Sequence, residues 1–229
     1  MPRRLRGGEA VPEGFWLVAD RQTAGRGRQG RAWIDGAGNF MGSTVVYPGF
    51  GDPPAPSLAL LAGLAVFEVT SPLLPKPHHV MLKWPNDVLL NGSKLAGRLI
   101  EAIWLEDEAQ SIVIGMGVNI AQAAVPAAGI LSFPATSLED SLGYIPDRNI
   151  ILRTILASII ALRPHMGTES FISSWEKKLA YHGRQVQVAA RHRKIGLAGG
   201  KQRNALLRSL GRDRHQPNRT ALARKGLRH

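Results

Sequence analysis

The chain has 229 residues and no cysteine, which suits one medium-sized domain with a small appendage and excludes disulfides and thiolate chemistry. A cysteine-free chain without an apolar signal segment or a membrane-length apolar run is expected to be soluble and cytoplasmic. The net charge of +12 suggests an anionic partner, but residues 190–229 hold 12 lysines and arginines against one acid, Asp213, which leaves the remaining chain at +1.

The first part of the chain predicts strands separated by a glycine-rich loop. Residues 14–19 form a short apolar run typical of a buried strand, and the Gly/Arg-rich segment after it predicts a loop. A second strand is expected over residues 39–47. Apolar residues then follow Ser57 at helical spacing, so a helix is expected to begin there with Ser57 as its N-cap.

The middle of the chain predicts an antiparallel meander. Residues 80–84 read as a strand stopped by Pro85. Residues 88–90 lead into Asn91-Gly92, the strongest short hairpin signal in the sequence, and residues 95–105 form the return strand. A further β-branched strand is expected over residues 111–114.

Two helices are expected near the end of the patterned region, over residues 149–163 and 168–181, with a break at Pro164 and Gly167. Together these elements predict an α+β fold, with a mixed, mainly antiparallel sheet and helices packed on one face. After Gln187 the periodicity stops, and we expect a basic, poorly ordered tail.

The loop before the second strand concentrates three glycines and three arginines in residues 25–31. Glycines let backbone N–H groups approach an anion, and guanidinium groups bind carboxylate or phosphate in a bidentate manner. The spacing Gly25-x-Gly27-x-x-Gly30 also fits a dinucleotide fingerprint, but a strand follows it where that motif needs a helix. A disordered RGG segment would be repeated and less apolar.

Two further motifs carry polar groups at strand ends. Lys83-Trp84-Pro85-Asn86-Asp87 places a lysine beside an indole and a proline at the end of a strand. Residues 115–120, Gly-Met-Gly-Val-Asn-Ile, combine small residues with an amide that could read an adenine edge. Either motif alone is an ordinary strand end, and their combination with the arginine loop suggests one anion-binding site.

In this order the three motifs, with Lys94 to Gly97 (KLAG) between them, resemble the biotin protein ligase family over roughly residues 14–185. The resemblance implies a biotin/lipoate protein ligase-like fold and a two-step reaction. Biotin and ATP form biotinyl-5′-adenylate, and a lysine of a biotin carboxyl carrier protein then takes the biotin. Mg²⁺ accompanies the ATP in this family. The carrier would belong to acetyl-CoA carboxylase or a related carboxylase.

The resemblance also implies roles for individual residues. Lys83 and Arg26 would neutralise the carboxylate and the phosphate, which repel each other. The interaction energy of two unit charges in contact is on the order of 4 kcal/mol at an effective dielectric near 20. Arg28 would hold the adenylate while the loop from Gly25 through Gly27 to Gly30 closes over it. The remaining assignments are Gln22 to biotin, Trp33 and Asn119 to adenine, Asn86 to the nucleotide, and the backbone of Leu95, Gly97, Gly115 and Gly117 to the biotin wall. No protein metal ligand and no covalent nucleophile is assigned.

The sequence departs from the family at both ends. Family members carry an upstream strand and Ser-Thr-Asn segment, whereas this chain opens at a segment resembling the end of the helix after it. We therefore expect residues 1–181 to form a catalytic domain lacking that segment, with in-frame codons for it upstream. Residues 182–188 read as the first strand of the family's small β-barrel, so 182–229 would be a barrel remnant running into a tail produced by a shifted reading frame.

Three alternatives stay open at this point. A lipoate or octanoate ligase would share the fold, although KWPND and GRGRQGR favour biotin. An inactive ligase remnant would keep the motifs without turnover. A basic nucleic-acid-binding module would explain the pI of 10.8, but its charge should not be confined to an unpatterned tail. Without a helix-turn-helix, no specific DNA partner is expected.

Overall fold

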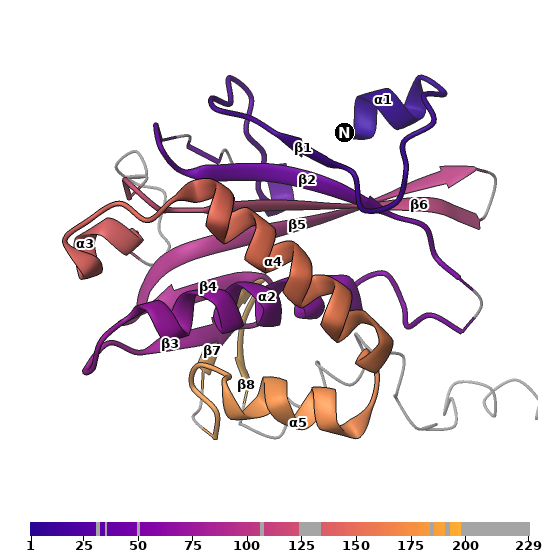
Figure 1. Ribbon diagram of the computed structural model, residues 1–229. Helices are drawn as coiled ribbons and strands as arrows, with labels where there is room; N and C mark the ends of the chain where they lie inside the picture. The colour runs from indigo at the N-terminus through magenta and orange to yellow at the C-terminus, as the bar shows by residue number, and fades with distance from the viewer. Residues whose placement is uncertain are drawn as a thin grey trace, which may run out of the picture.

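The computed structural model describes residues 1–30, 33–34, 36–49, 51–105, 108–123, 134–183, 186–190 and 193–197. Within these residues the centre is a six-stranded antiparallel sheet of order β1-β2-β6-β5-β4-β3 (Figure 1). The strands are β1 (Trp16–Val18), β2 (Phe40–Val46), β3 (Val80–Lys83), β4 (Asp87–Leu90), β5 (Ser93–Leu105) and β6 (Glu108–Val118). The expected α+β class with a mainly antiparallel sheet is confirmed.

The hairpin between β4 and β5 turns at Asn91 and Gly92, as the sequence predicted. Both residues have positive φ, 51° and 83°, which is the backbone that a two-residue type I′ turn requires. The register then shifts between Val88 and Leu89, where β4 pairs with β5. This bulge and the turn together set which residues of β5 lie beside Asp87 at the end of β4.

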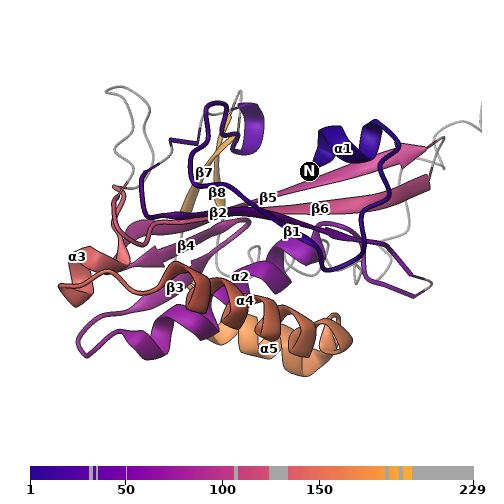
Figure 2. The same cartoon turned by 45° about the horizontal axis from the view of Figure 1, so that its top comes forward.

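Three longer helices cover one face of the sheet: α2 (Ser57–Thr70), α4 (Arg148–Leu162) and α5 (Glu169–Lys177). Figures 1 and 2 show them on the same side of the strands. Ser57 is the first residue of α2 and not its N-cap, because its hydroxyl donates to the Pro54 carbonyl at 2.6 Å. The helix itself begins where the sequence predicted.

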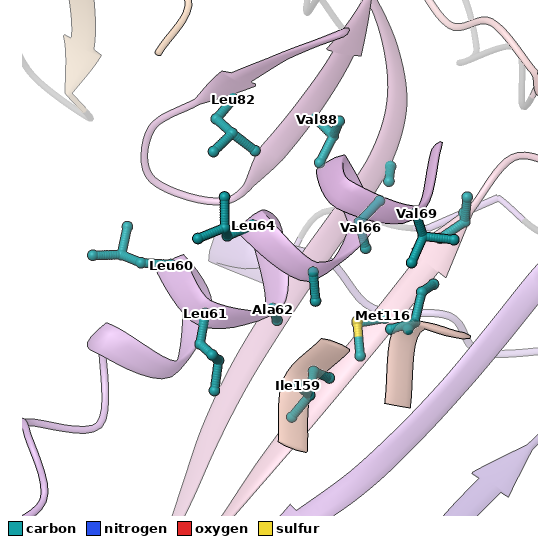
Figure 3. Close-up of a cluster of buried hydrophobic side chains, with 14 of the residues drawn as sticks. Leu60, Leu61, Ala62, Leu64, Val66, Val69, Leu82, Val88, Met116 and Ile159 are labelled. Carbon is teal, nitrogen blue, oxygen red and sulfur yellow. The ribbon is translucent and has the colours of Figure 1, made fainter. Parts of the chain in front are cut away.

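The core lies between this helix layer and the sheet. Figure 3 shows α2 contributing most of its residues to it, with Leu82, Val88 and Met116 from the strands and Ile159 from α4. Trp175 of α5 is fully buried and donates its indole N–H to the Leu60 carbonyl at 3.2 Å. Burying such side chains contributes about 1.5–3 kcal/mol each, so this face supplies most of the stability.

A short helix lies on the opposite face of the sheet. α1 (Pro2–Arg6) follows Met1, and Met1 and Leu5 pack with Val45 and Val113 in a second, smaller apolar cluster (Figure 2). The opening residues are therefore helical, as expected, but helices are not confined to one face. None of the three longer helices lies on this second face of the sheet.

Three details differ from the sequence-based elements. α3 (Leu138–Leu142) was not predicted, although Ser137 and Asp140 form a capping box at its start. α5 ends at Lys177, earlier than residue 181, because the chain leaves the helix to bond with β3: the Leu82 N–H donates to the Lys178 carbonyl. Short 3₁₀ turns, η1 (Arg28–Gly30), η2 (Ser71–Leu73) and η3 (Arg163–His165), complete the described helices.

A separate two-stranded sheet follows α5. β7 (Val186–Ala190) fits the strand expected near residues 182–188, but β8 (Arg193–Leu197) pairs with it antiparallel. The expectation that strand structure stops after Gln187 was therefore wrong, because a five-residue strand is too short to show a clear period. Residues 198–229, which hold most of the expected tail, lie outside the described residues. None of the described helices is long and apolar enough to cross a membrane.

Candidate active site on the open face of the sheet

Glycines lie on the face of β5 and β6 that the longer helices do not cover. Gly97 of β5 and Gly117 of β6 are directly paired, and Gly115 pairs with Leu99 two residues further along. The Trp33 indole lies against this surface. A methyl group on Gly117 would overlap its ring, and one on Gly97 would lie 2.9 Å from it. Only glycine permits this approach, so the surface forms a flat floor under an aromatic ring.

The glycine/arginine loop brings Trp33 to this floor by closing on itself. The Trp33 N–H donates to the Gly25 carbonyl at 3.0 Å, and a side chain on Gly25 would overlap the Trp33 carbonyl. The Gln22 side-chain oxygen would lie 2.9 Å from the same added atom. Residues 31 and 32, including Arg31, lie outside the described residues. Gly25 is therefore needed where the two ends of the loop meet.

Lys94 provides a cation beside the floor. Its Nζ lies 5.5 Å from the Trp33 ring centroid, within cation–π range, and 2.8 Å from the Asp87 Oδ1. An atom added to Gly97 would lie 3.3 Å from the same Nζ. Lys94 belongs to the KLAG motif, but its residue type and spacing predicted no separate role for it. Its contact with Asp87 depends on the register shift between Val88 and Leu89, which the sequence does not reveal.

Asp87 joins Lys94 to Lys83. The Lys83 Nζ donates to the second carboxylate oxygen at 3.0 Å, and the Asp87 side chain is only 13% exposed. Burial raises the pKa of the Asp87 carboxyl, but the charges and hydrogen bonds of Lys94 and Lys83 outweigh burial and hold this pKa below its usual range. One carboxylate thus fixes two ammonium groups at the edge of the floor, leaving a net positive charge there.

Asn86 links the arginine loop to the strands. Its side-chain oxygen accepts from an Arg28 Nη at 3.3 Å, and its amide donates to the Arg98 carbonyl at 3.1 Å. The Arg98 N–H in turn donates to the Asn86 carbonyl at 3.0 Å. Arg28, far away in sequence, is thereby held beside the Lys83–Asp87 turn.

The Asn119 side chain is buried and bonded within the protein, whereas the sequence predicted that it would contact adenine. It is 2% exposed, and its amide donates to the Thr136 carbonyl at 3.0 Å and to the Lys94 carbonyl at 3.4 Å. Its N–H donates to the carbonyl of Leu95, whose side chain is buried in the core. These bonds hold the backbone on either side of Lys94, and the adenine contact stays a prediction.

A buried amide that the sequence analysis missed fixes the end of β6. The Asn39 side-chain oxygen accepts from the N–H groups of Ile120, Ala121 and Gln122 at 2.8–3.1 Å. This bonding ties the start of β2 to the segment following Asn119. This role of Asn39 could not be predicted, because a single asparagine at the start of a strand forms no recognisable sequence pattern.

The predicted site residues therefore fall into two groups. The structure brings together Gly25, Trp33, Gly97, Gly117, Lys83, Asn86 and Arg28, with Gly115 on the same floor and Leu95 and Asn119 behind it. The side chains of Gln22 and Arg26 are exposed on the loop, which also contains Gly27. The roles given to these loop residues depend on a bound ligand and stay predictions.

Two hollows lie away from this site. One of about 400 Å³ lies at the helix-covered face, lined by prolines 53, 54 and 56 with Trp104 and Met166. Among the described residues that line it, Asp52 alone is charged, and it pairs with Arg163. An anionic ligand finds no unpaired cation in that lining, so the open face is the better candidate for carboxylate and phosphate chemistry.

Comparison with known proteins identifies the family of the chain. Residues 8–119 match the Biotin/lipoate A/B protein ligase family. A biotin–[acetyl-CoA-carboxylase] ligase of Paracoccus denitrificans is 33% identical over 177 residues, covering 75% of this chain and 73% of the relative. The bifunctional ligase/repressor BirA of Bacillus subtilis is 38% identical over 147 residues, which cover 64% of this chain and 45% of that relative.

The fold is shared with solved ligases. A biotin protein ligase from Aquifex aeolicus, solved in complex with biotin and ATP, superposes with a TM-score of 0.70 and 32% identity. The match covers 85% of this chain and 80% of that one. Sequence identity, coverage and fold thus agree, and this chain belongs to the biotin/lipoate A/B protein ligase family.

Proposed function

We propose that this chain is a biotin protein ligase that forms biotinyl-5′-adenylate from biotin and ATP and transfers the biotin to a lysine of a carrier protein. The observation that carries the proposal is the glycine floor under Trp33 with the Lys94 ammonium at its edge. The compact bicyclic ring of biotin, with its carboxylate tail, fits such a surface: one side of the ring system rests on the glycines and the carboxylate meets the cation.

In the first step a biotin carboxylate oxygen attacks the α-phosphorus of ATP, the bond to the β-phosphate oxygen breaks, and pyrophosphate leaves. Both reactants are anions, so their approach is opposed by charge. Lys94 and Lys83, held by Asp87, supply fixed positive charge at the floor, and Arg28 is held beside them through Asn86. Such preorganised charge lowers the barrier because it needs no rearrangement during the reaction.

In the second step the neutral amine of a carrier lysine attacks the carbonyl of the mixed anhydride. An amide bond forms, AMP leaves, and the amine loses its proton to solvent. The site residues described above hold the anhydride for this attack, and the loop from Gly25 to Gly30 shields it from water. A biotin carrier protein is thus the partner class, and acetyl-CoA carboxylase is the proposed source of the carrier.

Trp33 has to move when biotin binds. In the free chain its indole is in contact with the floor glycines, so it lies where the ligand rings would rest. We infer that biotin displaces the indole, which then becomes available for the adenine contact expected from the family resemblance. The loop closure at Gly25 would serve as the pivot of this movement.

Mg²⁺ is expected to arrive bound to ATP. The described residues contain no group of three acidic or histidine side chains that could hold a metal ion, and Asp87 is already engaged by two lysines. Mg²⁺ is commonly held by substrate phosphates with one or two protein carboxylates, which suits such a site. When bound, the ion would neutralise part of the triphosphate charge.

The function is tested by incubating the purified full chain with biotin and MgATP and measuring pyrophosphate release together with isolated biotinyl-adenylate. We expect pyrophosphate release that depends on biotin, followed by labelling of an added biotin carrier domain. Lipoate and octanoate serve as competing acids in parallel reactions. Release with those acids and not with biotin would assign the chain to the other branch of the family, and no release from a folded sample would contradict the proposal.

Cytoplasmic location stays a prediction, as does the division into residues 1–181 and 182–229. Fractionation of cells that express the chain would test the location. Limited proteolysis would test the division, because a separate folded unit should survive cleavage near residue 182.

A further inference from the structure

Arg98 of β5 is a buried cation without a hydrogen-bond acceptor. It is 2% exposed, and its Nε, Nη1 and Nη2 are each buried with no partner among the residues that the structure describes. Burial lowers the pKa of the Arg98 guanidinium to about 10, against the opposing effect of the Asp87 carboxylate, so it stays charged at neutral pH. An unpaired buried charge is one of the most destabilising features a fold can carry.

The helix above Arg98 is shaped to admit it. Gly63 lies in the middle of α2, and an atom added there would lie 2.6 Å from the guanidinium carbon and 2.7 Å from both terminal nitrogens. Glycine inside a helix is itself destabilising relative to alanine. Two destabilising features, a glycine inside a helix and an unpaired buried charge, therefore lie in contact at Gly63 and Arg98. Destabilising residues that occur together in this way are expected where function requires them.

Arg98 lies directly behind the Asn86–Asp87 turn. Its backbone forms two hydrogen bonds with Asn86, one in each direction, at 3.0 and 3.1 Å. On the open face the same turn carries Lys83 and Lys94 on Asp87 and Arg28 on Asn86. The turn thus separates exposed or half-exposed cations on the open face from a fully buried cation on the helix-covered face.

We propose that Arg98 is an electrostatic positioning residue, which supplies a fixed positive potential behind this turn and favours an anionic ligand on the glycine floor. The identity of that ligand, the biotin carboxylate, rests on the proposed function. A buried charge is screened by salt much less than a surface charge, and it cannot move away from the site. Lys83 and Lys94 are partly exposed and therefore more strongly screened by salt, so Arg98 has a role that they do not duplicate.

This role differs from simple space filling in one measurable respect. A structural role would affect every ligand of the floor, because it acts through the shape of the turn. An electrostatic role affects a ligand only in proportion to its charge. Biotin and biotinol, its uncharged alcohol analogue, share their ring system and chain and differ in charge, so they separate the two roles.

The test measures the affinity of the full chain for biotin and for biotinol by isothermal titration, in wild type, Arg98→Met, Arg98→Gln and Arg98→Lys. We expect both neutral variants to bind biotin about tenfold more weakly and to bind biotinol within about twofold of wild type. Arg98→Lys should recover most of the biotin affinity. The two neutral side chains guard against one of them failing to fold.

Thermal unfolding gives the second readout. Arg98→Met should unfold at the same or a higher temperature than wild type, because it removes an unpaired buried charge. Unchanged biotin affinity in a folded neutral variant, or equal losses for biotin and biotinol, would overturn the role of Arg98. A folded wild type that binds neither compound would instead contradict the proposed function, so the two failures are distinguishable.

Discussion

The two faces of the central sheet are built from opposite kinds of residue. The face toward α2, α4 and α5 buries large apolar side chains such as Ile114 and Leu82, which have no exposed area. On the other face, the central strands β5 and β6 present Gly97, Gly115 and Gly117. Along β6, Ile114 and Met116 lie in the core, whereas the alternate residues Gly115 and Gly117 lie on the open face, as a period of two requires.

This difference separates stability from binding within single strands. Burial of apolar side chains on the helix-covered face stabilises the fold. The glycine floor buries no such side chains and instead leaves a surface on which another molecule can bind. The charged side chains of the site follow the same division: Lys83, Lys94 and Asp87 lie at the floor. Arg98, buried on the packed side, is an exception. Substitutions on the two faces should therefore separate into losses of ligand affinity and losses of folding stability.

The largest effect is expected from the cations of the open face. Lys94→Ala should lower the rate of biotinyl-adenylate formation by about 10²–10³-fold, because it removes the charge beside Trp33. Lys83→Ala should cause a smaller loss, since Lys83 acts through the same carboxylate. Pyrophosphate release measures both. An unchanged rate in either variant would contradict the role given to that lysine, and a larger loss from Lys83→Ala would reverse their order.

Two glycine-to-alanine substitutions on β6, each adding one methyl group, test whether the glycine floor binds the ligand. Gly117→Ala should weaken biotin binding about 10²-fold, because the added methyl overlaps the place of the Trp33 ring. Gly115→Ala is the matched control: its added atom has no neighbour closer than 3.5 Å, so the free protein should be unchanged and the loss smaller. Isothermal titration compares the two, and equal affinities would show that the floor does not hold the ligand.

The packed face should respond in the opposite way. Ile114→Ala, next to Gly115 on β6 but on the other side of the sheet, should cost about 3 kcal/mol of unfolding free energy through the cavity it leaves. This corresponds to a fall in melting temperature of about 8 °C for a chain of this size. Biotin affinity measured well below that temperature should stay at the wild-type value. A large loss of affinity in the folded variant would break the separation of the two faces.

The smallest effect expected is on pH dependence. The folded pKa of Asp87 is lowered from 3.8, so its stabilising contribution is complete above about pH 4 and is lost as pH falls through the lowered pKa. Asp87→Asn should lower stability at pH 7 by about 2 kcal/mol, since it leaves two lysines without their carboxylate. Denaturant unfolding from pH 7 to pH 3 should show this difference shrinking below pH 4. A constant difference would argue against the ion pairs.

Much of the fold was predictable because its signals are local. The Asn91-Gly92 turn, the strands around it and the start of α2 each depend on a few neighbouring residues. The pairing of Lys94 with Asp87 was not predictable, since it depends on the bulge that shifts the register of β4 against β5. Arg98 was missed for a related reason: an arginine in a strand reads as exposed, and only the three-dimensional arrangement places it opposite Gly63.

The roles of the site residues were predicted mainly from the family resemblance. Residue types and spacing indicated an anion site, but did not show that the Trp33 indole covers the floor glycines in the free chain. That arrangement arises from the crossing of the loop ends at Gly25. Long-range contacts of this kind cannot be read from sequence periodicity.

The central claim is that the open face of the sheet binds the ligand, and hydrogen exchange with and without a non-hydrolysable biotinyl-adenylate analogue tests it most directly. The account predicts slower exchange in peptides covering residues 22–30 and 83–97, with no change in peptides of α2 on the other face. Protection centred instead on residues 48–56, which border the hollow at the helix-covered face, or no protection in a saturated and folded sample, would contradict the account.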